Sequence, residues 1–156
     1  MMHIEKIPTL NSYEDWIEKA ERELLLFEKV GSVYDMANCL LTLNALPEWI
    51  EKSEKAPEML SLLAKEKISI MKHLKLNVDK LKENDIDQAL RLVRLFCNHA
   101  KHGDKKTNLV KIEMSASLPA KFPIRFDYLS VWDEEKHSIK ANELLRNIIE
   151  FWRKHI

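Results

Sequence analysis

The stretch DIDQALRLVRLFCNHAKHGD, from Asp85 to Asp104, predicts an amphipathic helix together with both of its ends. Asp85 stands three residues before Gln88, a variant of the capping box that begins many helices. Gly103 suits the position just after a helix, where a left-handed backbone conformation favours glycine. Between these ends, apolar residues recur at the helical spacing that predicts one buried face. They are Ile86, Ala89, Leu90, Val93, Phe96, Cys97 and Ala100.

Similar signals predict helices on both sides of this stretch. One begins near Ser12, which stands three residues before Asp15, and ends at Gly31. The next begins at Ser32 and must be kinked or broken at Pro47, which lacks an amide hydrogen. A third begins near residue 57, residues 76–85 interrupt the pattern, and the last runs from about residue 138. The expected core residues of the first, third and last helices are Trp16, Ala20, Leu24, Phe27, Val30, Leu60, Leu63, Ile68, Met71, Ala141, Leu144, Leu145, Ile148 and Trp152.

After Gly103 the apolar period changes to that of a strand. Apolar and polar residues alternate around residues 110–115 and again around residues 124–128, which predicts a two-stranded antiparallel ribbon within about 107–132. The apolar residues that alternate with polar ones are Val110, Ile112 and Met114 in the first strand and Ile124, Phe126 and Tyr128 in the second. We therefore expect a single domain over residues 1–156. It is mainly α, a bundle of four to five helices with a small two-stranded β insert before the C-terminal helix.

Composition excludes several functional classes. The chain has equal numbers of basic and acidic residues, so no global positive field indicates nucleic-acid binding. Cys39 and Cys97 lie among apolar residues and are interpreted as buried free thiols. No glycine-rich loop indicates a nucleotide cofactor, so no cofactor is expected. The N-terminus carries early charges and no long apolar run, so we expect a cytoplasmic protein without a membrane span.

A polar ridge is predicted along the helix that begins at Asp85. At about 100° per residue, Arg94, Asn98 and His102 stack on one side because they are spaced by four. Lys101 lies beside them, whereas His99 lies about 140° around the helix from Arg94. We expect Arg94, Asn98 and His102 to line an exposed groove that faces its mate across a two-fold axis.

Local charge at this ridge suggests a phosphate-binding patch. Residues 91–111 contain six Lys or Arg against one acid, in a chain of zero net charge. The candidate phosphate-binding residues are Arg91, Lys101, Lys105 and Lys106. A structural interpretation stays open, because cations in the last turn of a helix stabilise it by about 0.3–1 kcal/mol each. Trp49, Trp132, Trp152, Tyr34 and Phe151 are interpreted as core residues rather than as a surface for stacking bases.

Two resemblances add to this pattern. RLFCNH, from Arg94 to His99, resembles the Arg-x(4–6)-His signature of the HEPN superfamily, small helical bundles many of which are metal-independent ribonucleases. NHAKHG, from residue 98, resembles the Asn-x-x-Lys-His motif of uncharacterised bacterial and phage proteins. Those proteins also tend to carry segments similar to ANCLLTLNALPEWI and IIEFWRKHI of this chain. The HEPN resemblance implies a homodimer in which Arg94 and His99 meet across the two-fold axis.

The resemblance implies a ribonuclease of a phage-defence or toxin–antitoxin type, with RNA as substrate and an antitoxin as a candidate partner. A histidine would remove the 2′-hydroxyl proton, and the hydroxyl oxygen would attack the adjacent phosphate. The candidate catalytic residues are Arg94, Asn98, His99 and His102. His99 and His102 alone do not make a zinc site, so no metal is expected. Two alternatives stay open: a non-catalytic helical module that binds RNA, a nucleotide or a protein partner, and an accessory protein with a purely structural bundle.

Overall fold

The computed structural model describes residues 10–102, 111–115, 128–132 and 135–156, with the backbone alone for residues 101, 102 and 111–115. Within these ranges the chain is mainly helical, with a small antiparallel sheet before the C-terminal helix, so the predicted fold class is confirmed. In chain order the elements are α1 (Tyr13–Val30), α2 (Val33–Lys52), α3 (Glu58–His73), α4 (Val78–Lys82), α5 (Ile86–His102), β1 (Lys111–Ser115), β2 (Tyr128–Trp132), β3 (Lys136–Lys140) and α6 (Ala141–His155).

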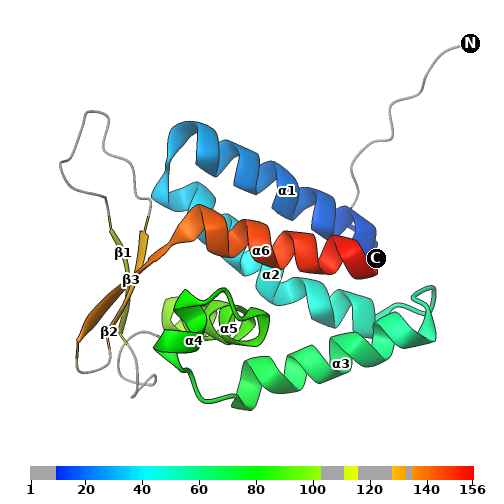
Figure 1. Ribbon diagram of the computed structural model, residues 1–156. Coiled ribbons are helices and arrows are strands. Elements are labelled where there is room, and N and C mark those ends of the chain that lie inside the picture. Colours follow the sequence, from blue (N-terminus) through cyan, green and yellow to red (C-terminus); the bar gives the residue numbers. More distant parts are fainter. Residues whose placement is uncertain (1–9, 103–110, 116–127, 133–134) are drawn as a thin grey trace, which may run out of the picture.

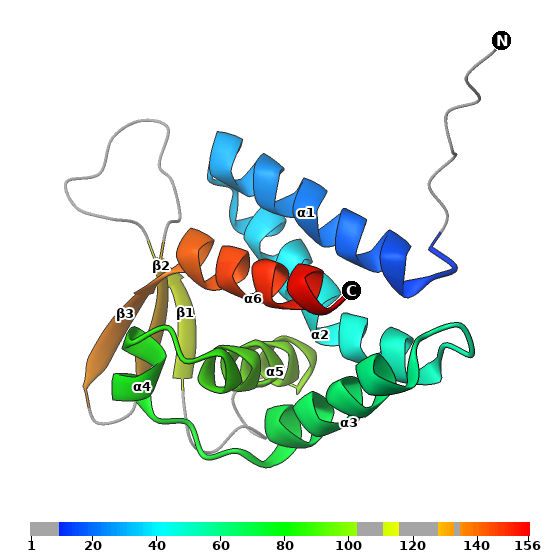
Figure 2. The same cartoon turned by 45° about the vertical axis from the view of Figure 1, so that its right-hand side comes forward.

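Helix α5 occupies the middle of the molecule. Figures 1 and 2 show it between α2 and α6 on one side and α3 on the other, with the sheet next to it. Leu90, Leu92 and Val93 are inaccessible to solvent although they point to different sides of α5. Such all-round burial is typical of the central helix of a bundle. The predicted helix is therefore the element on which the other helices pack.

The cap contacts confirm the predicted helix starts at Ser12 and Asp85 and the predicted stop at Gly31, whereas the predicted stop at Gly103 lies outside the described residues. Ser12 caps α1, because its Oγ accepts a hydrogen bond from the Asp15 amide at 3.2 Å. Gly31 ends α1 with φ 70° and ψ 28°, the left-handed conformation expected there. Asp85 caps α5, because its Oδ1 accepts a hydrogen bond from the Gln88 amide at 3.0 Å. Each of these signals acts over three or four residues, which is why the sequence predicts them.

Some helix predictions were wrong. Helix α2 continues through Pro47 to Lys52, so of the two predicted outcomes, a kink or a break, the break does not occur. Leu43, Leu46 and Ile50 on both sides of Pro47 are fully buried, so core packing stabilises the turn that lacks a hydrogen bond. The segment 76–85 contains the short helix α4, which the sequence pattern did not indicate. Val30 is exposed rather than buried, because it lies in the last turn of α1, next to Gly31.

The sheet has three strands in the order β1-β2-β3, not the two that were predicted. The missed strand is β3, which the sequence analysis assigned in part to the start of the last helix. In the register of β2 and β3, Leu129 lies opposite Ile139, and both side chains are buried in the core. The predicted strand positions Val110, Ile124 and Phe126 lie outside the described residues.

Candidate functional site

On the same side of α5, the ridge of Arg94, Asn98 and His102 continues toward the start of the helix with Arg91 and Asp87, and this first half of the ridge packs α5 against α3. Asp87 Oδ1 accepts a hydrogen bond from Lys67 Nζ at 2.8 Å, and Lys67 is a nearly buried residue of α3. One turn further along, the Arg91 guanidinium donates a hydrogen bond to the Met71 carbonyl in the last turn of α3. A cation on a C-terminal carbonyl stabilises a helix end. Arg91, a predicted phosphate-binding residue, therefore has at least one structural contact.

The second half of the ridge has fewer contacts in the described part of the chain. Arg94 and Asn98 are both partly buried, at the boundary between the core of the bundle and its surface. Arg94 Nε is buried, and no described residue accepts a hydrogen bond from it. An unbonded buried donor on a charged group costs free energy, which an anion at this position would lower.

The charge of Arg94 acts on two neighbours. Burial lowers the pKa of Arg91, and the nearby positive charge of Arg94 lowers this pKa further. Burial raises the pKa of Cys97 to about 12, while Arg94 acts in the opposite direction. The sulfur of Cys97 contacts the Leu40 carbonyl of α2 at 3.7 Å, so Cys97 belongs to the core. Arg91 and Arg94 therefore form a local pair of cations beside the core.

The structure does not bring Arg94 and His99 together within one chain. Helix α5 is continuous from Ile86 to His102, so the two side chains lie about 140° apart around its axis. His99 is partly buried on the flank that also carries Leu92 and Leu95. Lys101 and His102 lie in the last turn of α5, and their side chains are outside the described part. The predicted phosphate-binding residues Lys105 and Lys106 also lie outside the described residues.

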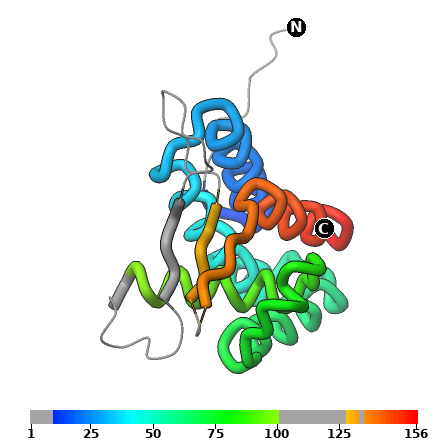
Figure 3. The backbone as a smooth tube through the Cα atoms, turned by 60° about the vertical axis from the view of Figure 1, so that its left-hand side comes forward, coloured from blue at the N-terminus to red at the C-terminus, as the bar shows by residue number. Residues whose placement is uncertain are grey.

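The end of α5 projects beyond the core. Ala100 continues the apolar stripe of Val93 and Phe96, yet it is exposed, whereas those two residues are buried. Figure 3 shows α5 passing behind β2 and β3. The prediction that Ala100 is a core residue is wrong, because the last turn of α5 extends beyond the helices that pack on the rest of α5. Asn98 and His99 therefore lie at the boundary between core and surface.

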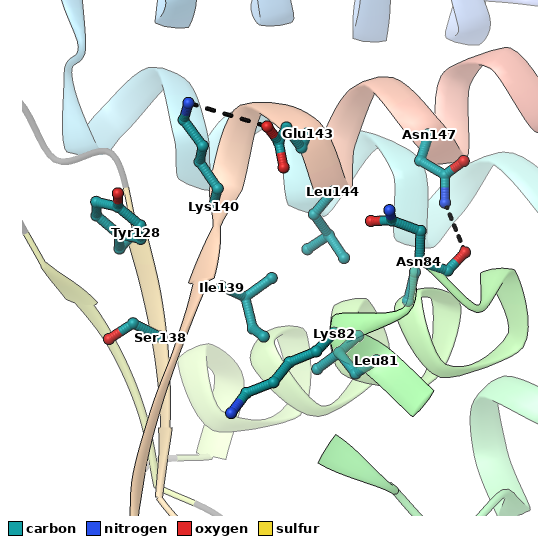
Figure 4. A pocket seen from close by; sticks show the side chains of 11 residues that line it. Leu81, Lys82, Asn84, Tyr128, Ser138, Ile139, Lys140, Glu143, Leu144 and Asn147 are labelled. Carbon is teal, nitrogen blue, oxygen red and sulfur yellow. Dashed lines mark hydrogen bonds and ion pairs between the residues drawn. The ribbon is translucent and has the colours of Figure 1, made fainter. Parts of the chain in front are cut away.

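A cavity that sequence analysis missed lies at the edge of the sheet. It has a volume of about 240 Å³ and is lined by residues of α4, β2, β3 and α6. Figure 4 shows Ile139, Leu144 and the side-chain amide of Asn84 directed into the same space. Asn84 has φ 63°, and its carbonyl accepts a hydrogen bond from Asn147 Nδ2 at 3.2 Å. No sequence signal pointed to this cavity, because neither α4 nor β3 was predicted.

The residues of α2 that carry the second resemblance have packing contacts. Thr42 Oγ1 donates to Glu23 Oε1 at 2.5 Å, and Lys19 Nζ lies 2.7 Å from the same hydroxyl. Trp49 stacks on Trp16 of α1 with 5.4 Å between the ring centroids. These contacts hold α1 against α2. They explain Thr42 and Trp49 of this segment without a ligand.

Comparison with protein-family models, with curated proteins and with solved structures finds no match to this chain. None of the helices in the described ranges combines the length and apolarity needed to cross a membrane. Within the same ranges, no three His, Cys, Asp or Glu side chains come together in a way that suits a metal ion.

Proposed function

We propose that this protein is a HEPN-like ribonuclease that cleaves RNA without a metal ion, using the second half of the ridge on α5. The observation that carries the proposal is the partly buried Arg94, whose Nε has no hydrogen-bond acceptor among the described residues. Asn98, one turn further on, is a second polar group that no described contact explains. A phosphate group would accept hydrogen bonds from both side chains.

The proposed reaction is an attack of the RNA on its own backbone. His102 or His99 removes the proton of the 2′-hydroxyl, and the oxygen attacks the adjacent phosphorus. The bond to the 5′-oxygen of the next nucleotide breaks, and that oxygen takes up a proton. The Arg94 guanidinium stabilises the negative charge that develops on the phosphate oxygens. Asn98 orients the histidine or the phosphate. The products are a cyclic phosphate and a free 5′-hydroxyl.

Because α5 is a continuous helix, the choice of catalytic histidine determines whether one chain or two chains form an active site. If His99 is the base, Arg94 must come from a second copy, because the two side chains diverge on α5. If His102 is the base, Arg94, Asn98 and His102 share one side of α5, so a single chain supplies all three. The proposed homodimer is thus required only by the first assignment.

The test is cleavage of RNA in the presence of a chelator. Arg94→Ala and the variant of the catalytic histidine are expected to lower the cleavage rate roughly 100- to 10,000-fold. The matched control is His73→Ala, because His73 is an exposed histidine in the last turn of α3 and is not one of the candidate catalytic residues. Equal activity in His99→Ala, His102→Ala and wild type would refute the catalytic assignment. RNA binding by the wild type with no cleavage of any RNA would instead support the non-catalytic binding module.

A further inference from the structure

We propose that single-stranded RNA binds to the outer face of β2 and β3 and to the cavity at the edge of β3. This inference rests on the proposed function, because it names a second surface for the same RNA, on the side of the sheet that faces away from α5. The residues Tyr128, Trp132, Lys136, Ser138 and Lys140 are called the β2–β3 face below. Successive residues of a strand point to opposite sides. Since Leu129, Val131 and Ile139 are buried in the core, the β2–β3 face points away from it.

The register of the sheet places an aromatic ring beside a lysine at both ends of this face. Trp132 lies opposite Lys136, and Tyr128 lies opposite Lys140. Lys136 Nζ lies 5.8 Å from the centre of the Trp132 ring. Tyr128 and Trp132 are four residues apart, which corresponds to about 13 Å along a strand. Between them, β2 and β3 carry small residues, the exposed Ser138 and the buried Ser130. On the other side of β2, the register places Glu113 of β1 opposite Ser130.

This combination suits single-stranded nucleic acid. Aromatic rings stack on any base, and lysines neutralise the phosphates that connect the bases. In β2 and β3 none of the residues on this face is acidic, although the whole chain has zero net charge. Lys140 Nζ lies 3.9 Å from Glu143 Oε1 in an exposed ion pair. Such a long, exposed ion pair is weak, so a phosphate can compete with Glu143 for Lys140. Trp132 is exposed, contrary to the prediction that it belongs to the core, and the same prediction is wrong for Tyr34 of α2.

The cavity gives this surface a place for one base. Tyr128 and Ser138 line it although they lie across β3 from Ile139, so the cavity curves around the edge of the sheet (Figure 4). Its lining includes the apolar Ile139 and Leu144 together with polar groups, among them the Asn84 amide. Recognition of bases in single-stranded RNA commonly combines stacking on side chains with hydrogen bonds to the base edge, and the Asn84 amide can supply such a hydrogen bond. Its volume of about 240 Å³ is small for a drug-sized ligand and suits a fragment such as a base.

Binding should be measured apart from cleavage. The probe is a fluorescein-labelled ten-nucleotide 2′-O-methyl oligouridine, which lacks the attacking hydroxyl, and the readout is fluorescence anisotropy with the full chain. Trp132→Ala is expected to weaken binding roughly 5- to 150-fold, the loss of one stacked base, whereas Trp132→Phe retains most of the affinity. Lys136→Ala should reduce the slope of log affinity against log salt by about 0.7. Asn84→Gly should also weaken binding, because it removes the amide but keeps the positive φ.

The matched controls are Tyr34→Ala and Lys65→Ala, exposed residues on α2 and α3 that should bind like wild type. The proposal is refuted if Trp132→Ala and Lys136→Ala bind like wild type, if the controls lose as much affinity, or if the wild type does not bind the probe. The two proposals fail separately. Binding that depends on Trp132 without cleavage of natural RNA would refute only the ribonuclease. Cleavage that depends on Arg94 with unchanged binding by Trp132→Ala would refute only the RNA surface.

Discussion

Replacing Asp87 with asparagine should destabilise the protein far more than replacing its partner Lys67 with methionine. Lys67 Nζ lies 2.8 Å from Asp87 Oδ1 and 5.5 Å from the centre of the Phe151 ring, so it joins α3, α5 and α6. The Lys67 side chain is 10% exposed and that of Asp87 is 37% exposed. Asp87→Asn leaves a buried ammonium without a counter-charge, whereas Lys67→Met leaves a carboxylate that water and the start of α5 both stabilise.

The unequal exposure sets the magnitudes. Removing one partner of a fully buried pair costs about 3–5 kcal/mol, and the exposure of Asp87 reduces this to roughly 1.5–3 kcal/mol for Asp87→Asn. Lys67→Met keeps the apolar stem and should cost about 0.5–1 kcal/mol. The double variant should be more stable than Asp87→Asn alone, because it no longer buries an unpaired charge. Each kcal/mol corresponds to about 2–4 °C in Tm for a domain of this size.

The assay is urea unfolding of the three variants and wild type, followed by circular dichroism at 222 nm. A matched control is Lys65→Met, since Lys65 lies on the exposed side of α3 and should change stability by less than about 0.5 kcal/mol. The reasoning fails if Lys67→Met is as destabilising as Asp87→Asn, or if the cost of the double variant equals the sum of the two single costs.

Two further predictions concern the backbone and the thiols. Gly31→Ala should lower the free energy of unfolding by about 1–2 kcal/mol in urea titrations, because φ 70° is unfavourable for a residue with a Cβ; no loss would contradict the left-handed end of α1. Burial raises the pKa of Cys39 and of Cys97 to about 12, so neither thiol should react with Ellman's reagent at pH 8 before unfolding. Since these folded-state pKa values exceed those of the unfolded chain, their stabilising effect is complete below about pH 9 and is lost as the pH rises toward 12. Cys39→Ala with Cys97→Ala should therefore reduce the fall of Tm over this pH range, and an unchanged fall would refute the assignment.

The parts of the fold that depend on local chemistry are predictable from the sequence. Ser12, Gly31 and Asp85 mark helix ends through contacts within a few residues, and the spacing of apolar residues identifies the buried face of α6. Strand β3, with the sequence KHSIK, has one buried residue, Ile139. Residues 136–140 form a strand because they pair with β2. The order of apolar and polar residues within these five positions does not indicate that pairing.

In the candidate site, too, features that depend on local sequence are predictable, and contacts between separate elements are not. The helical period places Arg94 and Asn98 on one side of α5 without any knowledge of the other helices. The period does not show that α3 uses Asp87 and Arg91, because that depends on where Lys67 and the Met71 carbonyl lie. The cavity and the β2–β3 face are still less predictable. They arise where several separate elements meet, and two of these elements have little apolar pattern of their own.

The pairing of the first helix with the last has a consequence for how the chain is synthesised. Arg146 and Arg153 of α6 bind Glu28 and Glu21 of α1, and Trp152 completes the same core. On the ribosome, α1 and α2 can associate early, but the flank of α1 that α6 covers stays open until the last helix leaves the exit tunnel. A nascent or truncated chain without α6 therefore displays core side chains to chaperones and proteases. Once α6 has packed on α1, these core side chains are covered and chaperones and proteases no longer have access to them.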